Sequence, residues 1–465
     1  MKYTNIYIIN LFCFCLLLVF LTLFSCRKSL QTDLPIDKMT ATAVFSTDEG
    51  ATSAVLGIYS AMMPTLPYYS AGGTSIYGGL MSDELSLTST LDPEEAEFDA
   101  AKLTPANGIV LSNFWNWAYK MIYGANASIE GITASEKLTP AVKARLLGEA
   151  KFIRAWNYFY LVNLFGDVPL VLSTAYKESA TIPRSATAAV YDQILADLQE
   201  AKSLLPAAYA GTARIRPNRW AAVALLARVR LYRQAWAAAE AEATEVIGAG
   251  TYSLAPNPAA TFLAGSNETL WALSPVESGF NTTEARYFIP TTSATTKPAY
   301  AVNPALAAAF ESGDTRKGAW LGSKTVAAQT FYYPYKYKVY NLNLPVTETY
   351  TVLRYAEVLL VRAEARAQQD NLAGAKADLN AVRSRAALPP ATATDKAALL
   401  AAIEKERRIE FFAEWAHRWF DLKRWGRLEP VMTAAKPGWQ PYAALFPVPQ
   451  AELLKNPSLT QNPGY

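Results

Sequence analysis

The 465-residue chain has 43 lysine and arginine residues against 40 aspartate and glutamate residues, a formal net charge of +3 at pH 7. This near balance gives no sign of a basic patch that binds nucleic acid or an anionic membrane surface. The 11 tryptophan and 26 tyrosine residues are expected mainly in the core, although exposed aromatic rings also stack on sugars.

The first 25 residues have the features of a secretory signal peptide. Lys2 is their only cation, and from Leu11 to Phe24 only one residue, a threonine, is polar. This run is short for a membrane-spanning helix and typical of the hydrophobic region of a signal. An uncleaved membrane anchor is the alternative, because apolar residues before Leu11 extend the run, but Asn5 and Asn10 interrupt that extension.

Residues 23–26, Leu-Phe-Ser-Cys, resemble a lipoprotein processing box, in which cleavage leaves Cys26 as the first mature residue. Its thiol and amine would then carry enough acyl chains for stable membrane anchoring. Cys13 and Cys15 leave with the leader, so a mature chain that retains only Cys26 has no disulfide and no cysteine metal site. We expect lipidation at Cys26 and about 440 mature residues, enough for one large or two closely packed domains.

Apolar residues recur at spacings of three or four in the first half of the mature chain, which predicts helices. The clearest helix begins at Thr139-Pro140, a capping residue followed by proline at the first helical position, and ends before Gly166 and Pro169. Further helices are expected at 43–63, 112–132, 187–205, 217–233 and 235–249.

Two stretches have the composition of loops, 64–90 and 251–349. The second is rich in Pro, Gly, Ser, Thr and Asn and contains short strand-like runs such as Thr269–Leu273. Its most aromatic segment is 331–337, with the sequence FYYPYKY. Binding groups concentrate on loops that a rigid scaffold holds in place, so we expect the ligand site there.

Helical periodicity returns between 353 and 425. Apolar stripes at 353–367 and 372–382 predict a helix pair that turns at Asp370-Asn371 and ends at Pro389-Pro390, and a third helix is expected at 396–416. Ala363 and Ala375 lie twelve residues apart, as do Ala227 and Ala239. This spacing matches the small-residue positions of tetratricopeptide repeats, in which stacked helix pairs share one core.

Four blocks, in order along the chain, resemble the SusD/RagB family of outer-membrane nutrient-binding lipoproteins. They are GEAKFIRAWNYFYLVNLFGDVPL at 148–170, RYAEVLLVRAEA at 354–365, ERRIEFFAEWAHRWFDLKRWG at 406–426, and the C-terminal residues 447–465. Residues 26–30 with Pro35 also resemble the tethered start of that family.

The resemblance implies a mainly α fold: a tetratricopeptide-like scaffold of helix pairs with a loop-rich, partly β ligand-binding region. The expected organisation is a signal peptide at 1–25, an N-terminal region at 26–250 that includes the site loops 64–110, and a C-terminal region at 251–465. The latter comprises loops at 251–349, helices at 350–427 and a tail. The resemblance also implies a SusC-like TonB-dependent transporter as partner, an oligosaccharide or peptide ligand, and an outward-facing place on the outer membrane.

The segment 80–84, LMSDE, resembles a family segment that borders the site in glycan-binding relatives. Carboxylates there accept hydrogen bonds from sugar hydroxyls, and nearby tyrosines offer stacking faces. We hypothesise that ligand-binding residues from both loop regions converge on one shallow cleft. The candidates are Asp83, Tyr69, Tyr77, Tyr68, Trp320 and Tyr332, whereas Trp115 and Trp117 are expected in the core.

No catalytic, metal or cofactor site is expected. His417 is the only histidine, so Glu414-x-x-His417 lacks the second such motif that a di-iron site requires, and zinc lacks ligands. The neighbours Asp83 and Glu84 tend to point different ways, which disfavours a glycosidase pair. We expect a binding protein and not an enzyme.

Acidic residues recur every three or four positions from Glu406 to Asp421, with arginines interleaved. This pattern predicts an ion-pair ladder on a helix face, or buried pairs with the helices that carry Arg154 or Arg362. Three functional alternatives remain open: a peptide-binding member of the same family, a tetratricopeptide-type protein adaptor, and an enzyme.

Overall fold

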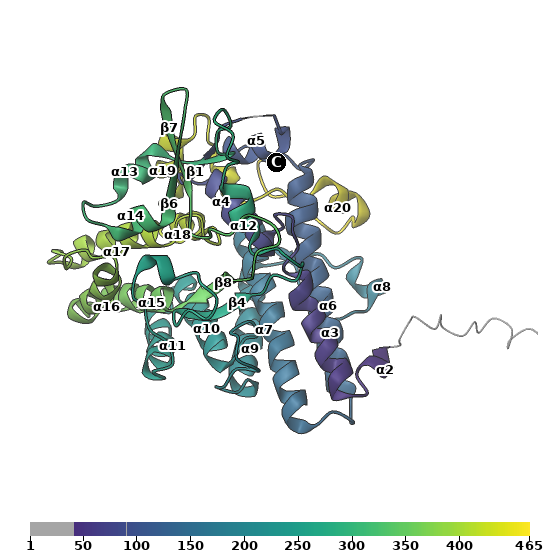
Figure 1. The fold of residues 1–465 in the computed structure, drawn as a ribbon. Coiled ribbons are helices and arrows are strands. Elements are labelled where there is room, and N and C mark those ends of the chain that lie inside the picture. The colour runs from purple at the N-terminus through teal and green to yellow at the C-terminus, as the bar shows by residue number, and fades with distance from the viewer. Residues whose placement is uncertain (1–40, 90) are drawn as a thin grey trace, which may run out of the picture.

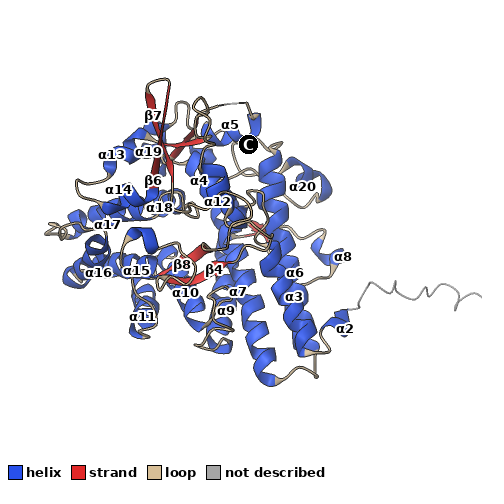
Figure 2. Cartoon of the chain, viewed as in Figure 1, coloured by secondary structure: helices blue, strands red, loops and turns tan. Residues whose placement is uncertain are grey.

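The computed structural model describes residues 41–89 and 91–465, so the predicted leader and Cys26 lie outside the described part of the chain. Helices make up most of the fold, as Figure 1 and Figure 2 show. In these described ranges the strands form four two-stranded antiparallel sheets. The mainly α fold class is therefore confirmed.

The N-terminal helices surround one long central helix. α7 (Pro140–Phe165) packs against α6 and α9, and α3 packs against both α6 and α7. The bounds of the others are α2 (Ala41–Val44), α3 (Asp48–Ala61), η1 (Tyr69–Gly73), α4 (Thr74–Met81), α5 (Pro93–Asp99), η2 (Val110–Asn116), α6 (Trp117–Ala134), α8 (Tyr176–Ser179) and α9 (Thr187–Leu204).

The helix stack continues from α9 through the antiparallel pairs that the alanine spacing predicted. α10 (Arg219–Tyr232) packs on α11 (Trp236–Gly248), α11 on α15 (Tyr355–Gln368), and α15 on α16 (Leu372–Arg385). Ala227, Ala239, Ala363 and Ala375 are all fully buried, because only a small side chain lets two helix backbones approach so closely. α17 (Lys396–Glu410) lies against α15 and α16, and α18 (His417–Arg424), α19 (Leu428–Ala435), η4 (Pro441–Ala444) and α20 (Gln450–Lys455) complete the chain.

The strands belong mainly to the loop-rich regions. β1 (Leu85–Leu87) pairs with β5 (Tyr300–Val302), and β4 (Thr269–Leu273) with β8 (Tyr350–Arg354). β6 (Leu321–Val326) and β7 (Gln329–Pro334) form a hairpin, and β2 (Val168–Pro169) pairs with β3 (Arg184–Ser185). Short helices connect them: η3 (Pro258–Ala260), α12 (Thr283–Phe288), α13 (Pro304–Ala309) and α14 (Thr315–Trp320).

Thr139 is the N-cap residue of α7 and Pro140 its first residue, as predicted, but the Thr139 side chain makes no capping bond: its hydroxyl and amide both donate to the Asp48 carboxylate, at 2.8 and 2.9 Å. Two other local predictions were wrong. Leu353 lies in β8 instead of a helix, because it pairs with β4 across the sheet. The helix expected at 396–416 ends at Glu410, since the following turn places Ala413, Trp415 and Ala416 at positive φ.

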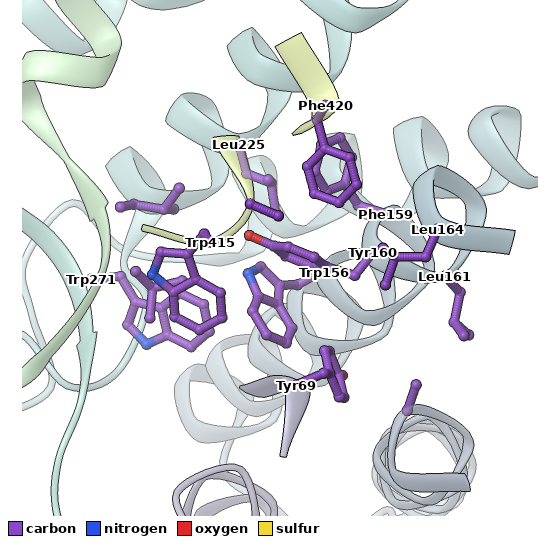
Figure 3. Packing of buried hydrophobic residues seen from close by; sticks show 14 of the residues in the cluster. Tyr69, Trp156, Phe159, Tyr160, Leu161, Leu164, Leu225, Trp271, Trp415 and Phe420 are labelled. Atoms are coloured by element: carbon purple, nitrogen blue, oxygen red, sulfur yellow. The ribbon is translucent and has the colours of Figure 1, made fainter. Parts of the chain in front are cut away.

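Aromatic rings fill the core between the helix stack and the strands. Trp156 of α7 meets Trp271 of β4 and Trp415 of the turn before α18, with ring centroids 5.9 and 5.3 Å apart and near-perpendicular planes. Figure 3 shows these rings beside Tyr160 and Phe420. Edge-to-face packing of this kind adds to the stabilisation from area burial alone.

The acidic ladder is a buried network and not a surface one. Glu406 and Glu410 pair with Arg316, and Glu410 and Glu414 pair with Arg354, all with little or no solvent exposure. Of the two helices predicted as partners, α15, which carries Arg362, does pair with this segment, because Arg424 binds Glu364. Arg154 and Arg362 themselves pair with Asp197 and Asp378 within the helix stack. The network therefore joins α17 to α14 and β8, the elements that lead into the loop-rich region.

Candidate functional site

The two loop-rich regions meet at one open cavity of about 540 Å³, called the β7 cavity here. Pairing of β1 with β5 brings residues 86–88 beside residues 297–302, and the Thr88 hydroxyl donates to the Pro298 carbonyl at 2.7 Å. The cavity is lined by Ser86, Leu87, Thr88, Lys297, Ala301, Val302, Pro304, Ala307, Ala308, Lys317, Gln329, Thr330, Phe331 and Tyr332.

The β6–β7 hairpin supplies the aromatic wall. Ala327 and Ala328 at its tip have positive φ, which closes a two-residue turn and lets β7 run back along β6. Phe331 and Tyr332 on β7 are half-buried, and both line the cavity. The neighbouring Tyr333 packs over Gly322, where a Cβ atom would lie only 2.3 Å from the ring.

Polar groups surround these rings. Gln329 and Thr330 come from β7, Ser86 and Thr88 from the β1 segment, and the Lys297 Nζ atom lies 5.3 Å from the centroid of the Phe331 ring. A cleft with half-exposed aromatic rings and hydroxyl, amide and ammonium groups at its rim is suited to hold a polar, ring-shaped ligand such as a sugar.

Of the six predicted ligand-binding residues, Tyr332 lines this cavity and the other five do not. Asp83 is 7% exposed, and its carboxylate accepts hydrogen bonds from Arg418 at 2.8 Å and Arg408 at 2.7 Å. Although burial alone would raise the pKa of Asp83, the two guanidinium groups lower it below its ordinary value. Asp83 thus ties the start of β1 to α17 and α18.

Tyr69, Tyr77 and Trp320 lie in the core. Tyr69 stacks on Trp156 and its hydroxyl donates to Asn157, while Tyr77 packs between Phe98 and other rings. Trp320 is fully buried, so neither face of its ring is on the surface, and its Nε1 donates to the Pro258 carbonyl at 2.8 Å.

Tyr68 is half-buried and belongs to a separate aromatic pair. Its ring stacks on Trp117, with centroids 4.1 Å apart, and the Lys120 Nζ atom lies 4.4 Å from the Trp117 centroid. Trp115 is buried as expected, but Trp117 was wrongly assigned to the core, because it is only half-buried at the start of α6. Tyr68 and Trp117 therefore offer a second aromatic surface outside the β7 cavity.

The remaining titratable candidates are buried inside the scaffold. Burial, followed by the neighbouring Asp83, raises the pKa of Glu84 to about 8, and its carboxylate accepts the Ala413 amide. His417 packs against Phe411, and burial together with nearby guanidinium groups lowers its pKa well below the ordinary value. Within residues 41–89 and 91–465, no cluster of three or more His, Cys, Asp or Glu side chains is arranged to hold a metal ion.

Comparison with known proteins identifies the family. Residues 74–231 match a family model described as "Starch-binding associating with outer membrane", and residues 280–443 match the SusD family model. A SusD-like protein of Formosa agariphila is 26% identical and the alignment covers 95% of this chain and 97% of the relative. The chain belongs to the SusD/RagB family.

Solved structures of SusD proteins share the fold. A SusD superfamily protein of Bacteroides vulgatus superposes with a TM-score of 0.80 at 21% identity, over 90% of this chain and 99% of that one. A laminarin-binding SusD-like protein superposes with a TM-score of 0.76 at 25% identity, over 90% and 99% of the two chains. The family includes carbohydrate-binding proteins, among them this laminarin-binding relative.

No helix in the described ranges of this SusD protein is both long and apolar enough to cross a bilayer. The aromatic run at 331–337 is the sequence feature that points to the β7 cavity, because it includes Phe331 and Tyr332. No sequence pattern singles out Lys297, Lys317 or Gln329, because they stand among ordinary loop and surface residues and reach the cavity only through the fold.

Proposed function

We propose that this protein is an outer-membrane lipoprotein that binds nutrient oligosaccharide at the cell surface and delivers it to a SusC-like TonB-dependent transporter. The observation that carries the proposal is the β7 cavity, which is lined by the half-buried aromatic residues Phe331 and Tyr332 together with polar side chains. The laminarin-binding relative with the same fold supports an oligosaccharide as ligand.

The cavity binds by stacking and hydrogen bonding. A sugar ring lies against Tyr332 or Phe331, and Gln329, Ser86 and Thr88 hydrogen-bond its hydroxyls. Of the six predicted contact residues, Tyr332 binds the ligand in this cavity, and Tyr68 forms a second aromatic surface together with Trp117. Asp83, Tyr69, Tyr77 and Trp320 instead hold the surrounding scaffold in place, since their polar groups and rings are buried against protein.

A separate apolar surface suits the transporter. Leu342, Leu344 and Val346 in the loop before β8 are 59%, 44% and 47% exposed, and Val276 is 54% exposed. The two loops touch, because the Asn343 amide donates to the Gly279 carbonyl at 2.8 Å. Exposed apolar side chains gathered on neighbouring loops favour burial against another protein.

Binding measurements on the soluble chain without residues 1–26 test the ligand assignment. We expect a glycan array and calorimetry to find an oligosaccharide ligand whose affinity falls about tenfold or more in Tyr332→Ala. Tyr176→Ala is the matched control, because Tyr176 is 81% exposed on α8 and does not line the β7 cavity. Equal affinity in Tyr332→Ala and wild type would remove this cavity from the site, and binding of peptides alone would favour the peptide-capturing alternative.

Purification from detergent-solubilised membranes tests delivery and anchoring. The full chain should recover a barrel partner, and Leu342→Asp with Leu344→Asp should reduce that recovery while leaving oligosaccharide affinity unchanged. Cys26→Ala should abolish incorporation of labelled fatty acid. Recovery of the wild-type protein alone, or an unacylated mature chain, would contradict the transport assignment or the anchor respectively.

A further inference from the structure

Positive charge gathers at the β7 cavity without compensating negative charge. Lys297 and Lys317 line it, and none of the other lining residues is aspartate or glutamate. Glu95 lies near β5, where its carboxylate accepts a hydrogen bond from the Tyr300 hydroxyl, but Glu95 is not a lining residue of the cavity. The cavity lining therefore carries two lysines and no carboxylate.

Neither lysine is engaged in an ion pair within residues 41–89 and 91–465. Some other lysines are paired: Lys202 pairs with Glu242 and Glu245, and Lys405 pairs with Glu311. Lys297 instead lies over the Phe331 ring, and Lys317 is an exposed residue of α14. Unpaired cations beside aromatic rings are free to form charge-assisted hydrogen bonds with a ligand.

Other cavities of the molecule lack this arrangement. The cavity beside α2 and α6 includes Glu130 and Glu136 together with Lys137, and the cavity beside α8 and α20 includes Glu452 with Lys455. Mixed charges of that kind neutralise one another locally. The β7 cavity differs from these two because its lining holds two lysines and no carboxylate.

We infer that the β7 cavity selects anionic oligosaccharides, which carry carboxylate or sulfate groups, over neutral ones. This inference rests on the proposed function and specifies its substrate class. Phe331 and Tyr332 hold a sugar ring, and Lys297 and Lys317 bind the acidic substituents on either that ring or its neighbour. Because both lysines are exposed, each contributes a modest factor in affinity, and salt weakens that contribution.

The test compares four oligosaccharides of equal length by calorimetry: tetragalacturonate, its methyl ester, a sulfated galactan tetrasaccharide and neutral laminaritetraose. We expect either tetragalacturonate or the sulfated tetrasaccharide to bind more tightly than the neutral pair. Lys297→Gln and Lys317→Gln should each lower that affinity about fivefold, and 0.5 M salt should lower it as well. The preferred acid distinguishes carboxylate from sulfate recognition.

Lys177→Gln is the matched control, because Lys177 on α8 is also exposed and unpaired in the described part of the chain but lies outside the cavity lining. It should leave all four affinities unchanged. If neutral sugars bind as tightly as acidic ones, and do so through Tyr332, the selectivity inference is overturned while the proposed function stands. If no sugar binds either here or on the glycan array, the proposed function itself fails.

Discussion

Arg354 holds the buried ion network together, and its replacement should be costly. Its guanidinium group makes five hydrogen bonds of 2.5–2.9 Å, to the carboxylates of Glu268, Glu410 and Glu414 and to the Glu410 carbonyl. Arg354 is 2% exposed and Glu410 is fully buried. Arg354→Met therefore leaves carboxylates buried with fewer cations, for which we expect a loss of about 3–5 kcal/mol in the free energy of unfolding.

Urea denaturation followed by circular dichroism measures this loss, and Arg219→Met is the matched control. Arg219 pairs with Glu245 at 2.7 Å, but the two side chains are 43% and 30% exposed. Solvent screens such a pair, so the control should lose less than about 1 kcal/mol. If Arg354→Met lowers the free energy of unfolding no more than Arg219→Met does, the buried network does not stabilise the fold.

The stability of wild type and Arg354→Met should also depend differently on pH. Burial would raise the pKa of Glu410, but Arg385, Arg354 and Arg316 lower it well below the ordinary value. A lowered pKa contributes stability that is present above the ordinary carboxyl pKa and is lost as the pH falls through the folded-state value. Arg354→Met weakens this effect, so the variant should lose its remaining stability at a higher pH than wild type.

Two further predictions concern buried positions. Burial raises the pKa of Glu284 to about 8, although hydrogen bonds from Ser75 and Tyr350 partly offset this shift. The folded state therefore holds a proton that the unfolded chain releases near pH 4.5, so Glu284→Gln should gain stability relative to wild type as the pH rises from about 4.5 to 8. Parallel plots of unfolding free energy against pH for the two proteins would contradict this. Gly78→Ala should cost about 1–3 kcal/mol, since its Cβ would lie 2.4 Å from that of Ala416, whereas Gly57→Ala, with open space around it, should gain about 0.5–1 kcal/mol. Equal effects of the two alanines on the urea midpoint would refute the close approach of α4 to the turn before α18.

Local patterns in the sequence were sufficient for most of the scaffold. The apolar period of α7 placed it correctly between Thr139 and Gly166, and the run Thr269–Leu273 is a strand with the predicted bounds. Alanine spacing predicted the close pairs α10–α11 and α15–α16, because helix periodicity and small-residue contacts depend on neighbours within one or two turns. The family blocks added the overall architecture.

Only the tertiary structure decided which side chains face solvent and which meet. Tyr69, Tyr77 and Trp320 look like binding aromatics in the sequence, but α7, α5 and η3 cover their rings, and Asp83 is occupied by arginines more than 300 residues away. The β7 cavity joins residues 86–88 to residues 297–332 through the β1–β5 pairing. Exposure of a ring or pairing of a charge depends on long-range packing, and no local pattern of residues encodes it.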